Sequence, residues 1–184
     1  MEARELAVGG AWAFAPEVHR DDRGLFVSPF EADAFTAAVG VELFPVAQAS
    51  TSVSRQGVAR GVHYARTRPG CAKYVHCPRG RVLDIVVDLR VGSPTFGKWD
   101  SVELAGFAAV YLPAGLGHAF VALEPDTTVC YLLSRGYEPA DELAVSLLDP
   151  ALDLPVPADA VLSDRDRAAP TLAEALAADL LPHH

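Results

Sequence analysis

Residues 73–90 read K-Y-V-H-C-P-R-G-R-V-L-D-I-V-V-D-L-R and give the clearest indication of the fold of this chain. The two halves of this stretch are rich in residues that favour strands, and Pro78-Arg79-Gly80 between them supplies a turn. In the second half, Asp84 and Asp88 share one face by the two-residue period of a strand. The other face is wholly apolar: Leu83, Ile85, Val87 and Leu89. The stretch therefore predicts a β-hairpin.

Strand-like runs continue on both sides of this hairpin. Two short strands are predicted around the turn H-R-D-D-R-G within residues 12–30. Further strands are predicted at 44–54, 99–104, 107–113, 118–123 and 128–134. A recurrence about every 8–12 residues is typical of an antiparallel sandwich or barrel.

Only two segments favour helices. Residues 31–39 predict a short helix that ends at Gly40, and Thr171 with Glu174 forms a capping box that opens a helix through about Leu180. The run at 44–54 has one polar face, which either meets solvent or lines a wet pocket: Gln48, Ser50, Ser52 and Ser54.

Composition limits the class of protein. A length of 184 residues with 51% hydrophobic content predicts one domain, residues 1–184, with a substantial core. The net charge of −9 argues against nucleic acid as a partner, and no apolar run is long enough to cross a membrane. The odd number of cysteines, the spacing of Cys71, Cys77 and Cys130, and an N-terminus unlike a secretory signal favour reduced packing thiols and a cytoplasmic location.

Chemistry-bearing residues gather at 60–73, where Arg60, His63 and Lys73 offer a phosphate clamp, a base and a cation for developing negative charge. The alternative is a basic strand edge and loop. Pro113-Ala-Gly-Leu-Gly-His118 matches P-x-G-x-x-H, the second short motif of the cupin jelly roll. A metal-binding cupin also needs an H-x-H pair and a nearby glutamate, whereas this chain has only His63 there and no glutamate before Glu103. We therefore expect neither a metal nor another cofactor.

From about Asp21 to Pro170 the sequence resembles the dTDP-4-dehydrorhamnose 3,5-epimerases and related epimerases of deoxysugar biosynthesis. The matching segments, in order, are D-D-R-G-L-F (21–26), R-G-V-H-Y (60–64), residues 73–90, S-P-T-F-G-K-W (93–99), L-P-A-G-L-G-H-A-F (112–120), Y-L-L-S-R-G-Y-E-P (131–139), D-P (149–150) and L-S-D-R-D (162–166). The resemblance implies a mainly β protein, a cupin-type jelly-roll β-barrel with short flanking helices that include one at the C-terminus.

The resemblance also implies a set of catalytic residues. Epimerisation next to a ketone needs a base, an acid on the opposite face and a group that holds the enolate oxygen. By resemblance, His63 is the base with Asp166 as its partner, Tyr131 is the acid and Lys73 stabilises the enolate. Each has a plainer alternative: a structural histidine, a surface aspartate, a core tyrosine and an edge-strand lysine.

Binding residues follow from the same resemblance. Arg23 and Arg60 would hold the diphosphate, Gln48 and His118 would contact sugar or phosphate, and Phe26 and Tyr137 would flank the thymine. In the family some of these come from a neighbouring subunit, so a homodimer is implied.

Four positions depart from the residues that the family commonly has. Ser50 replaces Asn, Ala65 replaces Gln, Leu154 replaces the Trp of Trp-Pro, and Val27 replaces Glu. We expect these positions to line or border the sugar site, which fits a relative that acts on another 4-keto-6-deoxyhexose.

The sequence therefore predicts metal-independent epimerisation at C3, C5 or both of a dTDP-4-keto-6-deoxyhexose, in a deoxysugar or natural-product pathway. Two alternatives stay open: a sugar-nucleotide ketoisomerase on the same scaffold, and a cupin that binds a sugar nucleotide without chemistry.

Overall fold

The computed structural model of the chain describes residues 1–67 and 70–184. Its strands are β1 (Glu2–Glu5), β2 (Trp12–Ala15), β3 (Val18–Asp21), β4 (Gly24–Val27), β5 (Gln48–Ser54), β6 (Ala59–Ala65), β7 (Lys73–Arg79), β8 (Arg81–Asp88), β9 (Trp99–Ala105), β10 (Ala109–Leu112), β11 (Leu116–Ala122), β12 (Thr127–Leu133) and β13 (Glu142–Ala144). Its helices are α1 (Ala32–Val39), α2 (Asp164–Arg167) and α3 (Leu172–Ala177).

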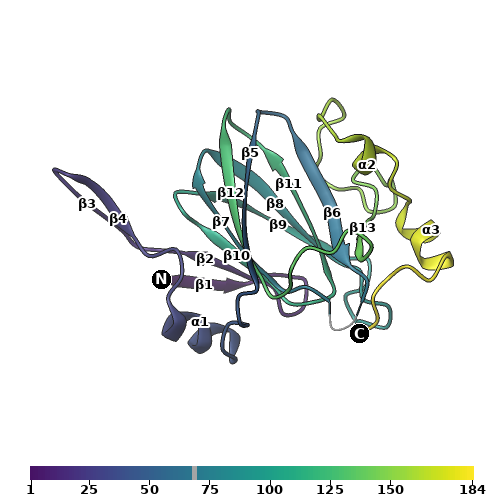
Figure 1. Cartoon of the computed structure of the whole chain (residues 1–184), viewed down its shortest axis with the longest axis horizontal. Helices are drawn as coiled ribbons and strands as arrows, with labels where there is room; N and C mark the ends of the chain where they lie inside the picture. Colours follow the sequence, from purple (N-terminus) through teal and green to yellow (C-terminus); the bar gives the residue numbers. More distant parts are fainter. Residues whose placement is uncertain (68–69) are drawn as a thin grey trace.

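Two antiparallel sheets form the body of the molecule (Figure 1). The six-stranded sheet has the order β1-β2-β10-β7-β12-β5, and the five-stranded sheet has the order β13-β6-β11-β8-β9. From β6 to β13 successive strands alternate between the two sheets, except that β8 and β9 are neighbours in the five-stranded sheet. Most strands therefore pair with strands that are not adjacent in sequence, as in a jelly roll. The predicted cupin-type barrel with short flanking helices is confirmed.

The predicted hairpin at 73–90 is wrong in one respect. Both strands form, but β7 pairs with β10 and β12, whereas β8 pairs with β11 and β9 in the opposite sheet. The turn at Gly80 is therefore a corner between sheets. Gly80 has a φ of 75°, and a Cβ there would collide with Thr127, so the corner needs glycine. Local sequence patterns predict strands and turns but not which sheet each strand joins.

Both faces of β8 are buried, each in a different hydrophobic core. Val82 and Val86 join the core between the sheets, while Ile85, Val87 and Leu89 join a second core on the outer side of the five-stranded sheet. The second core is covered by the C-terminal segment, through residues such as Leu147, Leu152, Leu162 and Leu181. The wholly apolar face of the sequence thus points outward, and the face with Asp84 points into the barrel, where a polar site can form.

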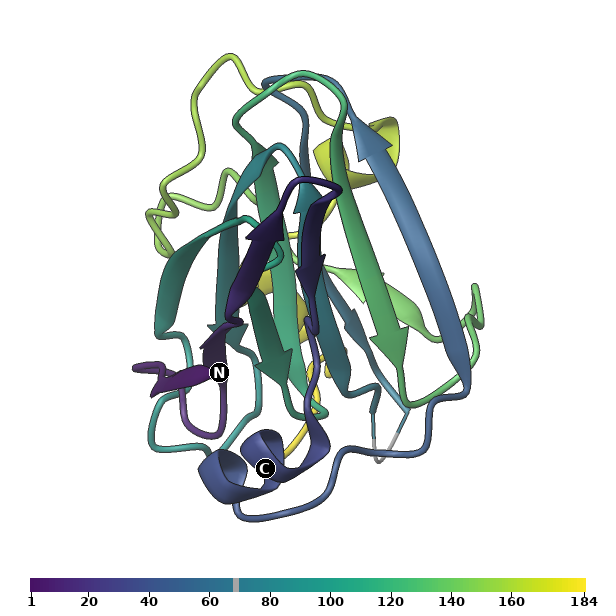
Figure 2. The ribbon, with the colours of Figure 1, turned by 90° about the vertical axis from the view of Figure 1, so that its left-hand side faces the viewer.

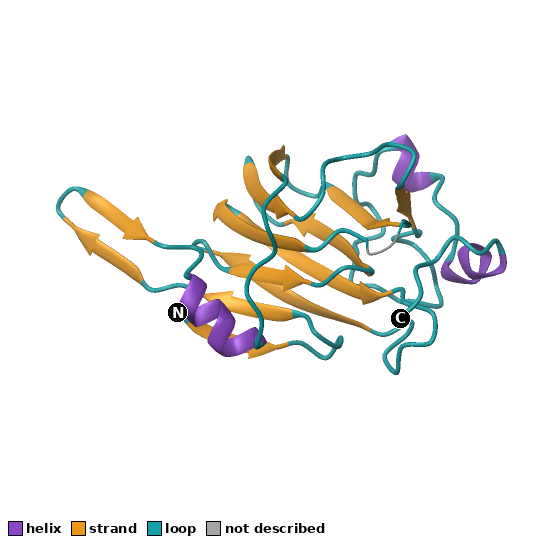
Figure 3. Cartoon of the chain, turned by 60° about the horizontal axis from the view of Figure 1, so that its bottom comes forward, coloured by secondary structure: helices purple, strands orange, loops and turns teal. Residues whose placement is uncertain are grey.

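The N-terminal part adds a helix and an arm. Helix α1 ends at Gly40 in the left-handed conformation, as predicted, and Phe35 packs with Phe14 and Tyr74 outside the six-stranded sheet. Figure 2 shows α1 at the lower end of the strands. The two strands predicted within 12–30 correspond to β2 and β4, but the first half of the predicted turn H-R-D-D-R-G belongs to a further strand, β3. Strands β3 and β4 pair into a hairpin that projects away from the barrel (Figures 1 and 3).

The predicted capping box of Thr171 and Glu174 is confirmed, although α3 ends at Ala177 and not near Leu180. The elements β1, β3, β13 and α2 were not predicted, because they have four residues or fewer and carry no clear periodicity. Among the described residues, no helix is long and apolar enough to span a bilayer.

Candidate active site

A cavity of about 200 Å³ opens between the two sheets and gathers most of the predicted site residues. Seven of them line it: Gln48, Arg60, His63, Lys73, His118, Tyr131 and Tyr137. They come from β5, β6, β7, β11, β12 and the loop after β12. The polar face of β5 therefore lines a wet pocket, at least through Gln48 and Ser50.

His63 is held by a buried carboxylate. Its Nε2 lies 2.6 Å from Oδ1 of Asp166, whose side chain is 4% exposed, whereas that of His63 is 29% exposed. Burial raises the pKa of Asp166, but hydrogen bonds and charge from His63, with further bonds from Ser163 and the Gly61 backbone, lower it more. The carboxylate thus stays ionised behind the imidazole and fixes its orientation.

Close packing of β6 on β11 sets the position of His63. His63 pairs with His118 across the two strands, and a bulge follows between His118 and Phe120. A Cβ on Gly61 would collide with Ala119 and the His118 carbonyl, so this approach requires glycine. The glycine of the R-G-V-H motif is therefore a structural requirement of the site.

Lys73 and Tyr131 face the same cavity from neighbouring strands. The Lys73 side chain is buried, and its Nζ lies 3.5 Å from the carbonyl oxygen of His63. The hydroxyl of Tyr131 lies 3.2 Å from Oγ of Ser52. Burial raises the pKa of Tyr131 well above its usual value, so the phenol keeps its proton at neutral pH.

A second imidazole–carboxylate pair lies deeper in the barrel. Nε2 of His118 is 2.8 Å from Oδ2 of Asp84, and both residues are buried. The His118 ring also packs edge-on against Tyr131, with centroids 6.1 Å apart. The other carboxylate oxygen of Asp84 has no hydrogen-bond partner within residues 1–67 and 70–184.

Gln48 links two segments at the mouth of the cavity through hydrogen bonds. Its Oε1 accepts a 2.8 Å hydrogen bond from the Tyr137 backbone N–H, and its Nε2 donates to Ser50 Oγ at 2.8 Å. The Arg60 guanidinium is anchored through Nε, which donates to Ser54 Oγ at 3.2 Å. The amide of Gln48 thus orients the loop that carries Tyr137.

Arg23 and Phe26 are not brought into this cavity. Both lie on the β3–β4 hairpin, where Arg23 binds Asp21 at 2.6 Å and Phe26 is 70% exposed. Figure 1 shows that hairpin pointing away from the strands that line the cavity.

Four cavity residues were not among the predicted site residues: Ser50, Phe120, Leu133 and Glu142. The two-residue period would have found Phe120 and Leu133, which follow His118 and Tyr131 by two positions. Glu142 lies on the unpredicted strand β13 and had no such signal.

A model of the family described as dTDP-4-dehydrorhamnose 3,5-epimerase matches residues 5–174. This chain belongs to that family. A dTDP-4-dehydrorhamnose 3,5-epimerase of Mycolicibacterium smegmatis is 50% identical, with 99% of this chain and 91% of the relative covered.

Solved structures of epimerases have the same fold as this chain. A 4-keto-6-deoxy sugar epimerase from the novobiocin biosynthetic gene cluster of Streptomyces spheroides is 47% identical with a TM-score of 0.95, over 100% of this chain and 94% of the other. A 3'-monoepimerase from Streptomyces bikiniensis in complex with dTDP-quinovose is 49% identical with a TM-score of 0.90, over 97% and 91%.

The departures from the family's usual residues lie in different places. Ser50 lines the cavity, but Leu154 packs in the outer core beneath the C-terminal segment. Ala65 is buried on β6 and Val27 ends β4 on the arm. Of these positions, Ser50 alone can bear directly on a ligand in this epimerase's own cavity.

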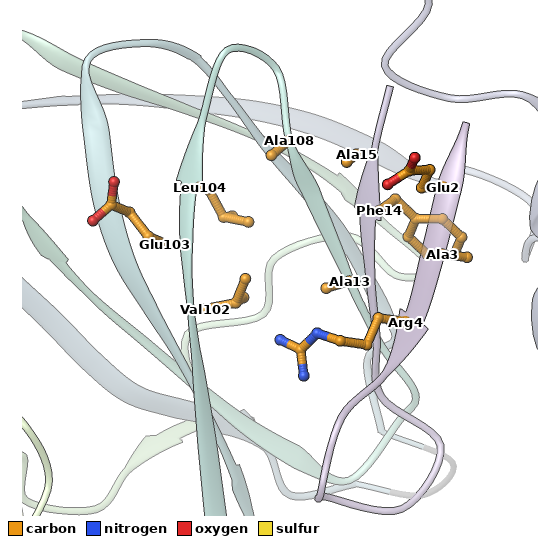
Figure 4. A pocket seen from close by; sticks show the side chains of 10 residues that line it. All are labelled: Glu2, Ala3, Arg4, Ala13, Phe14, Ala15, Val102, Glu103, Leu104 and Ala108. Carbon is orange, nitrogen blue, oxygen red and sulfur yellow. The ribbon is translucent and has the colours of Figure 1, made fainter. Parts of the chain in front are cut away.

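A second, larger cavity of about 290 Å³ opens between β1, β2 and β9, at another edge of the barrel (Figure 4). Its walls are mainly apolar, with charged side chains from Glu2, Arg4 and Glu103. Figure 4 shows Arg4 extending from β1 toward β9. This cavity contains none of the predicted catalytic residues, so size does not identify the active site of the epimerase.

Proposed function

We propose that this chain epimerises C3, C5 or both of a dTDP-4-keto-6-deoxyhexose, without a metal, by proton removal and return next to the ketone. The observation that carries this proposal is the His63–Asp166 pair at 2.6 Å in the same cavity as Lys73 and Tyr131. Family membership supports an isomerase, and relatives at about half identity include both a 3,5-epimerase and a 3'-monoepimerase.

In the proposed mechanism, His63 takes the proton from the carbon next to the ketone, and Asp166 stabilises the imidazolium that forms. The electron pair of the broken C–H bond moves into the enolate, whose oxygen is stabilised by the Lys73 ammonium. Tyr131 then delivers a proton to the opposite face of the same carbon. The protonated phenol and the ionised Asp166 suit these roles at neutral pH.

The sugar nucleotide would be held mainly by charge and stacking. Arg60 can present its terminal nitrogens to the diphosphate because Nε already donates to Ser54. His118 and Gln48 would contact sugar or phosphate, and Tyr137 at the mouth would flank the thymine. The solved relative with dTDP-quinovose supports this class of ligand.

We also propose a homodimer in which the β3–β4 arm of one protomer completes the site of its partner. Arg23 and Phe26 are far too exposed for residues that bind a ligand in their own chain. Mixing tests this assembly: His63→Ala, which lacks the base, and Arg23→Ala, which should bind substrate weakly, should together regain part of the activity at low substrate concentration when co-refolded. No recovery, together with a monomer in sedimentation, would contradict the dimer.

The function is tested with dTDP-4-keto-6-deoxyglucose in deuterated water. The wild-type protein should place deuterium at C3, C5 or both and yield inverted product, as located by NMR. His63→Ala should lose both exchange and inversion by about 10²–10⁴-fold. Absence of exchange in the wild type would mean that the cavity binds a sugar nucleotide without this chemistry.

His183→Ala is the matched control for that experiment. His183 lies near the C-terminus, away from both the cavity and the β3–β4 arm, and its half-exposed ring lies 3.7 Å from Asp179. The change deletes an imidazole without touching the cavity, and exchange should stay at the wild-type rate.

A further inference from the structure

Tyr131 has a protein partner that its proposed role as an acid requires. Its Oη lies 3.2 Å from Oγ of Ser52, and Ser52 Oγ is the only protein hydrogen-bond partner of that oxygen within the described residues. Ser52 belongs to β5, the edge strand of the six-stranded sheet, and pairs with Val129 on β12, two positions from Tyr131. The backbone ladder therefore holds the two hydroxyls together.

The direction of this hydrogen bond decides what Tyr131 can do. A phenol has one proton, and if it donates that proton to Ser52, none faces the cavity. If Ser52 donates instead, the phenol proton is free to point at a ligand. Both hydroxyls can donate, but only the arrangement in which Ser52 donates leaves the Tyr131 proton available for transfer to a ligand.

Proton delivery leaves a charge that must be stabilised. When the O–H bond of Tyr131 breaks, its proton bonds to the substrate carbon with the electron pair of the enolate double bond, and the ketone is restored. The pair of the broken O–H bond stays on Tyr131 as a phenolate, which solvent later reprotonates. Burial raises the pKa of Tyr131, so this phenolate is costly where it forms, and the hydrogen bond from Ser52 acts in the opposite direction.

We propose that Ser52 is a positioning residue that donates its hydroxyl proton to Tyr131, aims the phenol proton into the cavity and stabilises the phenolate after transfer. This inference rests on the proposed function. Ser52 touches no reacting atom and acts through Tyr131 alone. Hydrogen bonds to charged groups are the stronger ones, so the effect should be largest at the step that forms the phenolate.

The test separates reprotonation from enolate formation. Wild-type protein and Ser52→Ala are incubated with dTDP-4-keto-6-deoxyglucose in deuterated water, and NMR measures inverted product against product that exchanged with retention. In Ser52→Ala the ratio of inverted to retained product should fall at least about tenfold, because a hydrogen bond to the phenolate is lost. Proton removal by His63 should change far less.

Matched variants make the outcome specific. Ser52→Thr keeps the hydroxyl and should restore the ratio. Thr51→Val removes the hydroxyl of the preceding residue of β5, which lies on the exposed face 3.5 Å from Cys130 Sγ. This variant should leave the ratio unchanged. In a Tyr131→Phe background, Ser52→Ala should shift the ratio no further, because no phenolate forms.

The possible failures are distinct. Equal loss of exchange and inversion in Ser52→Ala would overturn the role of Ser52 but not the proposed function. The same would follow if Ser52→Ala shifted the ratio of inverted to retained product equally in the wild-type and Tyr131→Phe backgrounds. If Ser52→Ala does not fold, Ser52→Cys keeps the volume with a weaker donor and should still lower the ratio; an unshifted ratio overturns the proposal. A wild-type protein without exchange would overturn the proposed function, and this inference with it.

Discussion

Nε2 of His63 and Oδ1 of Asp166 lie 2.6 Å apart although 103 residues separate them in the chain. His63 is fixed by the β6–β11 packing, and Asp166 is fixed on α2, where its backbone N–H donates to Ser163. The pair therefore forms only when the C-terminal segment is docked on the five-stranded sheet.

Replacing Asp166 should lower catalysis without removing the imidazole. Asp166→Asn keeps the shape but loses the charge that supports the His63 cation, and we expect kcat to fall by about 10²–10⁴-fold. Asp164→Asn, on the exposed side of the same helix, should retain wild-type kcat. Activity of Asp166→Asn within threefold of the wild type would show that the pair is structural.

Removing the Tyr131 hydroxyl should separate exchange from inversion. Tyr131→Phe can still form the enolate through His63 and Lys73, but the proton then returns from the His63 side. NMR in deuterated water should find α-deuterium with retained configuration and little epimer. Inversion at a near wild-type rate would identify water or another group as the acid, and loss of exchange as complete as in His63→Ala would give Tyr131 a shaping role only.

Arg60 should contribute mainly to binding. Its Nε is anchored on Ser54, and the guanidinium stands at the cavity wall. Arg60→Ala should weaken dTDP binding in calorimetry by roughly 10–100-fold, the loss of one or two charged hydrogen bonds. Exchange at saturating substrate should change little. Arg55→Ala, an exposed arginine outside the cavity, serves as the control, and unchanged affinity in Arg60→Ala would rule out a phosphate contact.

Chelation should leave activity intact. Nε2 of His63 and Nε2 of His118 are each engaged by a carboxylate, and residues 1–67 with 70–184 contain no cluster of three or more metal-ligating side chains. After exhaustive dialysis against a chelator, the rate of epimerisation should match that of untreated protein. A loss that one divalent metal restores would contradict metal-independent chemistry.

Asp88 should make stability depend on pH below about 4. The buried carboxylate accepts hydrogen bonds from Arg90, Ser93 and Thr95. Burial raises its pKa, but these bonds lower it to about 2. A pKa below the unfolded value adds stability above about pH 4 that is lost as the pH falls toward 2, by about 2–3 kcal/mol.

Urea unfolding measures that effect. The free energy of unfolding of Asp88→Asn should be about 2–4 kcal/mol below that of the wild type at pH 7, because Arg90 loses its partner. This difference in free energy should become smaller as the pH approaches 2. Asp126→Asn, which removes an exposed carboxylate 3.6 Å from Arg79, should cost under about 1 kcal/mol at any pH. A gap that does not change with pH would place the stabilisation in packing and not in charge.

Much of this protein follows from its sequence. The two-residue period predicted most strands, Gly40 predicted the end of α1, and Thr171 with Glu174 predicted the start of α3. These features depend on neighbours a few residues apart, so local sequence contains the physics that produces them. The ordered motifs also predicted the family, which its matching model confirms.

Tertiary structure alone decided the rest, because it depends on contacts between distant segments. It sent β7 and β8 to opposite sheets, turned the face of β8 with Asp84 inward, and brought Asp166 behind His63. It also placed the β3–β4 arm, with Arg23 and Phe26, away from the chain's own cavity. The polar face of β5 has a function only in this arrangement: its side chains hydrogen-bond to Tyr137 of the loop after β12, Tyr131 of β12 and Arg60 of β6.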